Sequence, residues 1–213
     1  TVLALYEDGE RVPTLETGKQ GIVILDRTPF YAESGGQVSD EGAFTSGTLL
    51  ASVQKVKKDK NEIFLHTVTV EKGTLHEKDT LTACVAKDRR EDIRRNHSAT
   101  HLLHRALRMV LGDHVQQAGS LVEPDRLRFD FTHYQAMTDE EKQKVEDIVN
   151  RAIFDSYAVQ TRVLPLQEAM AEGAMGLFED KYHDTVRVVS MGDFSKELCG
   201  GTHVQNTSQL QAF

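Results

Sequence analysis

Two matched pairs of metal-binding side chains constrain the fold of this chain more than any other feature. His97 and His101 are four residues apart, and so are Cys199 and His203. Three imidazoles and one thiolate form a set of ligands that Zn²⁺ prefers in proteins. Because the pairs lie far apart in the sequence, only tertiary folding can bring them to one ion. The sequence therefore predicts a zinc site that joins two distant segments.

The local sequence around each pair suits such a site. His97 and His101 lie in a helical pattern, where residues i and i+4 share one face. Cys199 and His203 are separated by a segment with two glycines, which predicts a tight loop. His104 falls on the same helical face as the first pair, and we assign it a place behind the ligands or facing RNA rather than the role of a fifth ligand.

The sequence around the histidine pair argues against one common class of zinc enzyme, the zinc peptidases. Position 98 is Ser, so the His-Glu-x-x-His signature of zinc peptidases, whose Glu is the general base, is absent. We expect no carboxylate beside the histidine pair, so the sequence does not identify a general base.

The composition is that of an ordinary globular protein. Its 213 residues suffice for one large domain or two small ones, and no apolar run is long enough to span a bilayer. The chain begins with Thr and carries no signal peptide, so we expect an excised piece of a longer protein. Cys84 and Cys199 do not make a disulfide framework, which favours a reducing cytoplasm, and we expect Cys84 to be packed in a strand.

The charge of the chain limits how it could bind nucleic acid. A net charge of −8 argues against a nucleic-acid-binding surface over the whole protein but leaves room for a local basic patch. Arg89, Arg90, Arg94 and Arg95 precede the histidine pair, and we expect them where an RNA backbone would pass. We interpret the lysine run at 55–60 as the solvated tip of a hairpin.

Residues 1–87 are predicted to form a domain of short strands. Runs rich in Val, Ile, Leu and Thr at 21–26, 49–56, 63–70 and 81–85 are separated by turns that contain glycine or other turn-forming residues. Several short strands with this spacing suggest a small β-barrel.

The pattern changes at Asp88, and residues 88–213 are predicted to form a second, α+β part. Asp88 and Glu91 resemble a capping box that opens a helix, and Gly112 is a natural stop for it. We expect an antiparallel sheet with helices packed on one side. The elements expected after the first helix are a hairpin formed by 119–122 and 127–131, a helix opened by a capping box at Thr138 and Glu141, strands at 159–164 and 186–191, and a short helix at 166–171.

The remaining sequence signals are longer motifs, which lie in Arg27–Gln37, Asn96–His104, Gly119–Val122 with Leu127–Phe131, and Met191–His203. These segments resemble the alanyl-tRNA synthetase family, and the resemblance covers essentially the whole chain. Similar modules occur as free-standing editing proteins and, more distantly, in threonyl-tRNA synthetases. The resemblance implies the editing domain of the synthetase, with a barrel followed by an α+β editing core.

The resemblance also implies roles for individual residues. The family's zinc ligands correspond to His97, His101, Cys199 and His203, and its substrate-proximal glutamine corresponds to Gln117. The implied reaction is hydrolysis of seryl- and glycyl-tRNA(Ala) at the ester on the 3′-terminal adenosine, in the cytoplasm during protein synthesis. The implied partners are the acceptor end of tRNA(Ala) and the remaining aminoacylation and C-terminal domains of the synthetase.

An editing site answers a selectivity problem, because an alanine pocket cannot strongly exclude glycine or serine. A group that pairs with the serine hydroxyl would be left unsatisfied by alanine, at a cost of about 1–3 kcal/mol. Gln117 is the first candidate for this group and Thr100 the next.

Segment 34–37 is either a turn or a place where the backbone approaches the tRNA end. Zinc could activate water, position the substrate or be structural, and a free-standing deacylase and a non-catalytic tRNA-binding module remain alternatives.

Overall fold

The computed structural model describes residues 1–176 and 184–213 and divides the chain into two compact units. Unit 1 comprises Thr1–Ser34 and Val38–Arg90, and unit 2 comprises Gly35–Gln37 and Glu91–Phe213. The predicted division lay between residues 87 and 88; in the structure Gly35–Gln37 belongs to unit 2, and residues 88–90 belong to unit 1. No helix among the described residues is long and apolar enough to cross a membrane.

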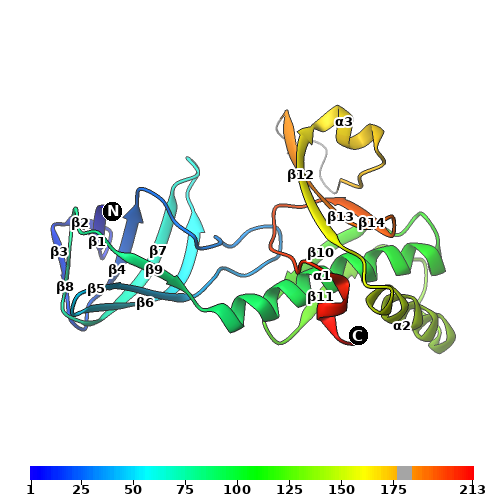
Figure 1. Ribbon diagram of the computed structural model, residues 1–213, viewed down its shortest axis with the longest axis horizontal. Coiled ribbons are helices and arrows are strands. Elements are labelled where there is room, and N and C mark those ends of the chain that lie inside the picture. The colour runs from blue at the N-terminus through cyan, green and yellow to red at the C-terminus, as the bar shows by residue number, and fades with distance from the viewer. Residues whose placement is uncertain (177–183) are drawn as a thin grey trace. The chain divides into compact units, whose positions relative to one another are not determined.

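Unit 1 is built from antiparallel strands (Figure 1). Its main sheet has seven strands in the order β2-β1-β4-β7-β6-β5-β9, and β3 pairs with β8 in a second sheet. Among the described residues no pairing joins the two edges of the main sheet, so the predicted small barrel is not confirmed. The strands are β1 (Val2–Glu7), β2 (Glu10–Val12), β3 (Thr14–Glu16), β4 (Gln20–Leu25), β5 (Gly42–Ser46), β6 (Leu49–Lys58), β7 (Phe64–Lys72), β8 (Thr74–His76) and β9 (Thr82–Val85).

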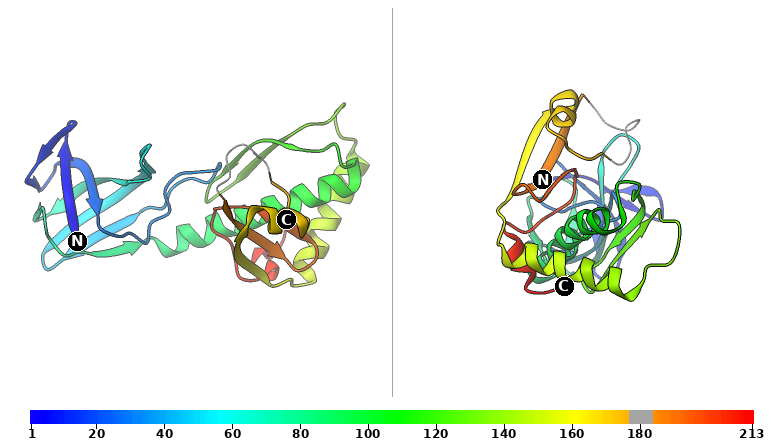
Figure 2. Two further views of the ribbon diagram at one scale, coloured as in Figure 1. Left: turned by 90° about the horizontal axis from the view of Figure 1, so that it is seen from above. Right: turned by 90° about the vertical axis from the view of Figure 1, so that its right-hand side faces the viewer.

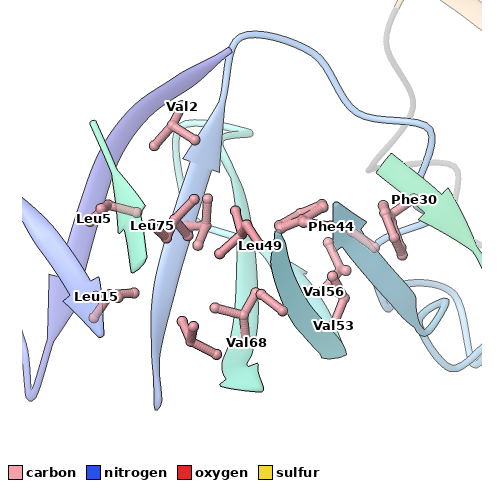
Figure 3. Close-up of a cluster of buried hydrophobic side chains, with 14 residues drawn as sticks. Val2, Leu5, Leu15, Phe30, Phe44, Leu49, Val53, Val56, Val68 and Leu75 are labelled. Carbon is pink, nitrogen blue, oxygen red and sulfur yellow. The ribbon is translucent and has the colours of Figure 1, made fainter. Parts of the chain in front are cut away.

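One face of these strands forms the core of unit 1. Strands β6 and β7 bury alternate residues over much of their length, as antiparallel strands with one solvated face do. Figure 3 shows this core between the strands, with Leu5, Leu75, Phe44 and Val68 among its members. Cys84 of β9 lies on the opposite, exposed face, so the expectation that it is packed is wrong.

A buried histidine ties a loop to this core. His66 of β7 packs edge-on against Phe30 and Phe44. Its Nδ1–H donates to the Val23 carbonyl over 2.9 Å, and the Thr28 hydroxyl lies 2.8 Å from Nε2. Burial lowers the pKa of His66, so the ring is neutral in the folded unit at pH 7.

Unit 2 is an α+β fold organised around helix α1 (Lys87–Leu111), of which residues from Glu91 onward belong to this unit. Figure 2 shows α1 with α2, the β10–β11 hairpin and β13 around it, and their apolar residues share one core. The predicted hairpin, second helix, flanking strands and short helix are confirmed. They are β10 (Gln117–Val122), β11 (Leu127–Phe131), α2 (Asp139–Phe154), β12 (Val159–Pro165), α3 (Leu166–Ala171), β13 (Thr185–Met191) and β14 (Ser195–Leu198), followed by a 3-10 helix (Thr207–Leu210).

The ends of the two long helices follow their local sequence, with one exception. Gly112 ends α1 with a φ of +116°, a conformation that favours glycine. At the start of α2 the Thr138 hydroxyl accepts from the Glu141 N–H, and the Glu141 carboxylate accepts from the Thr138 N–H, so this capping box is confirmed. The capping box predicted at Asp88 is wrong, because α1 has already begun at Lys87 and Asp88 lies inside its first turn.

The four arginines that precede the histidine pair are all engaged by groups of the protein itself. The guanidinium of Arg90 pairs with the buried carboxylate of Asp40. These contacts give the arginines a structural role and add no support for an RNA path along them. The remaining contacts are Arg90 with the Pro29 carbonyl, Arg89 with the Ser39 carbonyl and Glu41, Arg94 with Glu91, and Arg95 with Asp92.

Candidate metal centre

The structure gathers the four predicted metal ligands at one point of unit 2. The ligand atoms of His97, His101, Cys199 and His203 all lie within 4.8 Å of one another. The sulfur of Cys199 is 3.4 Å from Nε2 of His97 and 3.4 Å from Nε2 of His203. A tetrahedral zinc centre with Zn–S of about 2.3 Å and Zn–N of about 2.0–2.1 Å places sulfur and nitrogen about 3.6 Å apart. Donor set and spacing therefore both fit Zn²⁺.

The two ligand pairs reach this point as their spacing predicted, one pair on a shared helix face and the other in a tight loop. Helix α1 presents His97 and His101 on one buried face, with ring centroids 5.5 Å apart. Cys199 directly follows β14, and the loop after it turns His203 back toward the sulfur. The Arg187 guanidinium holds this loop by donating to the carbonyls of Cys199 and Gly201 over 2.7 and 2.8 Å.

Gly201 is required because the loop passes directly over a ligand ring. A Cβ atom at this position would lie 2.0 Å from Cε1 of His97 and 2.4 Å from its Nδ1. A Cβ at the neighbouring Gly200 would meet nothing within 4 Å. The two glycines of the loop therefore have different functions, and only Gly201 permits the close approach.

Three residues, which we call the outer acceptors, face the ring nitrogens on the side away from the centre. They are Gln37, Ser98 and Glu197. The Nδ1 atom of His97 is 2.6 Å from Gln37 Oε1, and Nδ1 of His203 is 3.0 Å from Ser98 Oγ. These contacts leave Nε2 of both rings directed at the sulfur, as metal-binding imidazoles require.

Gln37 connects one ligand ring to the loop that carries the other pair. Its side chain is 1% exposed, and its Oε1 also accepts from the Thr202 N–H over 2.9 Å, while its Nε2 donates to the Thr202 hydroxyl over 3.0 Å. Sequence reasoning gave this residue no role. Its position in a glycine-containing segment far from the histidines offered no local signal of such a contact.

The glycine-containing segment before Gln37 packs against the β10–β11 hairpin. The Val122 N–H donates to the Gly36 carbonyl over 2.8 Å, and Gly36 has a φ of +86°. A Cβ at Gly36 would lie 2.3 Å from Ser120 Oγ. The close backbone approach that Gly36 allows is therefore made to the hairpin of the same unit.

Glu197 is a buried carboxylate beside the histidines, so the expectation that none is present is wrong. It is 5% exposed, with Oε1 3.1 Å from Nδ1 of His104 and Oε2 3.8 Å from Nδ1 of His101. His104 lies behind the four ligands and also packs against Phe129, with ring centroids 5.2 Å apart. The sequence held one signal for this, because Glu197 precedes Cys199 by two residues and alternate strand residues share a face.

Protein charges alone polarise the ligand set strongly. Burial raises the pKa of the Cys199 thiol, but the neighbouring His97 and His101 outweigh burial and hold it well below its usual range. Burial lowers the pKa of His101, but Glu197 and Cys199 overcome burial and raise it to about 9. Burial, together with the charges of His101 and His97, lowers the pKa of His203 to about 3. The centre therefore favours a thiolate, which is the form of cysteine that binds metal.

The two residues predicted to recognise the substrate occupy different surroundings. Thr100 is buried in α1, and its hydroxyl donates to the Asn96 carbonyl over 2.9 Å. Gln117 begins β10 and pairs with Phe131 of β11. Among the residues that the structure describes, the Gln117 side chain makes no hydrogen bond.

Comparisons with known proteins agree on one family. Residues 1–89 match the family described as tRNA synthetases class II (A), and residues 186–213 match the threonyl and alanyl tRNA synthetase second additional domain. Along its whole length the chain is 53% identical to an alanine–tRNA ligase of Pelotomaculum thermopropionicum and 51% identical to one of Geobacillus thermodenitrificans. The chain belongs to the alanyl-tRNA synthetase family. It spans 24% of the length of these two relatives.

Each of the two matched segments contains a different part of the candidate metal centre. The second additional domain match contains Cys199 and His203, and the first match contains the outer acceptor Gln37. His97 and His101 lie between the two matched segments, where only the alignment with alanine–tRNA ligases covers the chain. The four-residue spacing of His97 and His101 on α1 therefore identifies two candidate ligands that neither family match contains.

Proposed function

We propose that this chain carries the editing site of an alanyl-tRNA synthetase, which hydrolyses the ester bond of seryl- and glycyl-tRNA(Ala). The proposal depends mainly on the convergence of His97, His101, Cys199 and His203, in a chain related to alanine–tRNA ligases along its whole length. The ion that suits these ligands is Zn²⁺. The partners are the acceptor end of tRNA(Ala) and the aminoacylation and C-terminal domains of the synthetase, and a reaction on charged tRNA places the site in the cytoplasm.

The ligands, the outer acceptors and the loop around Gly201 would each have a different role in the centre. The three imidazoles and the Cys199 thiolate would hold Zn²⁺, and the outer acceptors Gln37 and Ser98 fix the orientation of His97 and His203. When bound, Zn²⁺ would supply positive charge beside the ester and its attacking water. The loop around Gly201 leaves no room for a side chain next to His97 and so keeps the ligand set compact.

Selectivity for serine requires a polar group that alanine leaves unpaired. The Gln117 amide has a donor and an acceptor, and no described residue of the chain uses either. Thr100 already donates its hydroxyl proton to Asn96, so it has only acceptor capacity left. Loss of one hydrogen bond to a buried polar group costs about 1–3 kcal/mol. These contacts favour Gln117 over Thr100 as the residue that distinguishes serine from alanine.

One observation supports a second candidate function. Four protein ligands fill a tetrahedral zinc shell, which is typical of structural rather than catalytic zinc. A tRNA-binding module with a structural zinc would use the same four residues. Such a module would bind seryl- and alanyl-tRNA without hydrolysing either.

Deacylation rates separate these candidates. The zinc-loaded chain, at concentrations that saturate tRNA binding, should release serine from seryl-tRNA(Ala) faster than alanine from alanyl-tRNA(Ala). Cys199→Ala should abolish the reaction, and Cys84→Ala is the matched control because Cys84 is exposed in unit 1. Saturable tRNA binding without deacylation would reject the editing proposal in favour of the non-catalytic module.

A further inference from the structure

The buried carboxylate of Glu197 lies beside the metal-binding candidates, and among the described residues no Lys or Arg side chain neutralises it. Among the residues that the structure describes, its ion-pair contacts are His104 and His101, and no Lys or Arg pairs with it. A carboxylate that is 5% exposed has lost most of its hydration. A buried carboxylate is costly unless a positive charge lies nearby, and a His101 ring that binds a metal ion is neutral and cannot supply that charge.

The charge of the proposed zinc centre supplies what Glu197 lacks. Zn²⁺ bound by three neutral imidazoles and one thiolate retains one net positive charge. One carboxylate outside the ligands cancels this charge and leaves the buried group of residues neutral. A bound metal ion is often the largest local charge in a site, so the balance with its surroundings affects how tightly it binds.

The hydrogen-bonding pattern of the rings points to the same residue. An imidazole that binds metal through Nε2 carries a hydrogen on Nδ1, and this hydrogen needs an acceptor. Gln37 serves His97 and Ser98 serves His203. Nδ1 of His101 is buried without a hydrogen-bond partner among the described residues, and Glu197 Oε2 faces it at 3.8 Å. Glu197 therefore stands where the third acceptor is required.

His104 keeps the carboxylate in this place. Its Nδ1 lies 3.1 Å from Glu197 Oε1, and its ring packs against Phe129 of the hairpin. One carboxylate oxygen is thus engaged by a fixed ring, which leaves the other oxygen directed at His101.

We propose that Glu197 is a positioning residue of the metal centre, with His104 as its support. Its carboxylate balances the charge of the bound ion and accepts the Nδ1 hydrogen of His101. This inference depends on the proposed zinc site and adds a residue that acts through a ligand rather than on the substrate.

Zinc affinity tests this role without reference to catalysis. The dissociation constant is measured by competition with a chromophoric chelator on the whole chain and on Glu197→Gln, which keeps the shape and removes the charge. Loss of an acceptor behind a metal-binding histidine typically weakens metal binding by about 10- to 100-fold, and we expect this range. Glu172→Gln is the matched control, since Glu172 pairs with Arg162 and Lys196 away from the ligands. Equal dissociation constants for the two variants would overturn the proposal.

Two further variants separate the possible failures. Cys199→Ala should lose tight zinc binding, and if it does not, the proposed zinc site itself is wrong. Glu197→Asp retains the charge and should recover part of the affinity that Glu197→Gln loses. Circular dichroism and thermal unfolding without zinc measure folding separately. A Glu197→Gln variant that is less stable but binds zinc like the wild type would show a structural role only and overturn the proposal.

Discussion

A single methyl group at Gly201 should damage the metal centre, whereas the same change at Gly200 should not. A Cβ at Gly201 would lie 2.0 Å from Cε1 of His97 and 2.8 Å from Gln37 Oε1. Since ordinary van der Waals contact begins near 3.4 Å, the ring would have to retreat by about 1.4 Å, the difference between 3.4 and 2.0 Å. Zinc sites tolerate ligand displacements of only about 0.2 Å. Gly201→Ala should therefore displace His97 from the metal.

The size of this effect follows from the cost of overpacking. Adding a methyl group to a closely packed site costs about 1–3 kcal/mol, which corresponds to about 5- to 150-fold in zinc affinity if His97 moves to relieve the clash. Gly200→Ala introduces the same methyl group one residue earlier, where nothing lies within 4 Å. Both substitutions reduce the conformational freedom of the unfolded chain to the same extent. The difference in zinc affinity between the two variants therefore measures the effect of the clash.

Chelator competition on the two variants measures the difference directly. Gly200→Ala should bind zinc as the wild-type chain does, and Gly201→Ala should bind it several-fold to a hundredfold more weakly. Circular dichroism confirms that both variants are folded. Equal zinc affinity in the two variants would refute the reasoning, because it would mean that the loop does not press on His97.

Three other predictions concern selectivity and stability. Gln117→Ala should narrow the ratio of seryl- to alanyl-tRNA deacylation by about tenfold, which is the effect of about 1.4 kcal/mol, and an unchanged ratio in a folded, zinc-loaded variant would point to Thr100 instead. Thr138→Ala should lower the free energy of unfolding by about 1 kcal/mol in urea denaturation, because it removes the capping box of α2, and an unchanged midpoint would contradict this. Burial lowers the pKa of His66, so the unfolded chain takes up this proton first as the pH falls. The stabilisation that the neutral ring provides should therefore be complete above about pH 6.5 and lost below it, and His66→Gln should flatten the dependence of unfolding free energy on pH between 7 and 5.

Local sequence signals predicted the elements that carry the ligands. The period of α1 placed His97 and His101 on one face, and the glycines near Cys199 indicated the loop that follows β14. The Thr138 capping box and the stop at Gly112 were also readable, because each depends on residues within one turn of the helix. The structure adds that these segments meet.

Features that depend on contacts between residues far apart in the sequence could not be predicted from local patterns. Gln37 reaches His97 only because Gly35–Gln37 packs on the hairpin in unit 2. Glu197 reaches the histidines through the pairing of β14 with β13; its two-residue spacing from Cys199 was a weak signal of the shared face, but nothing local indicated that the carboxylate is buried. The expected barrel is not confirmed for the same reason, since closure of a sheet depends on its two edges and not on the strands themselves.

The sequence also did not determine which face of strand β9 is buried and which is exposed. The alternating pattern of β9 was read correctly as a strand, but Cys84 was assigned to the packed side and lies on the exposed side. A shift of one residue in register exchanges the two faces, so period alone does not decide which one is buried.

Zinc titration of deacylation tests the central claim most directly. Metal-free chain is supplied with increasing zinc while the release of serine from seryl-tRNA(Ala) is measured. The wild type and Cys84→Ala should be inactive without zinc and should reach full rate at one zinc per chain, and Cys199→Ala should stay inactive at that stoichiometry. Full activity in the metal-free chain, or a Cys199→Ala variant that responds to zinc as the wild type does, would contradict hydrolysis at a centre formed by these four residues.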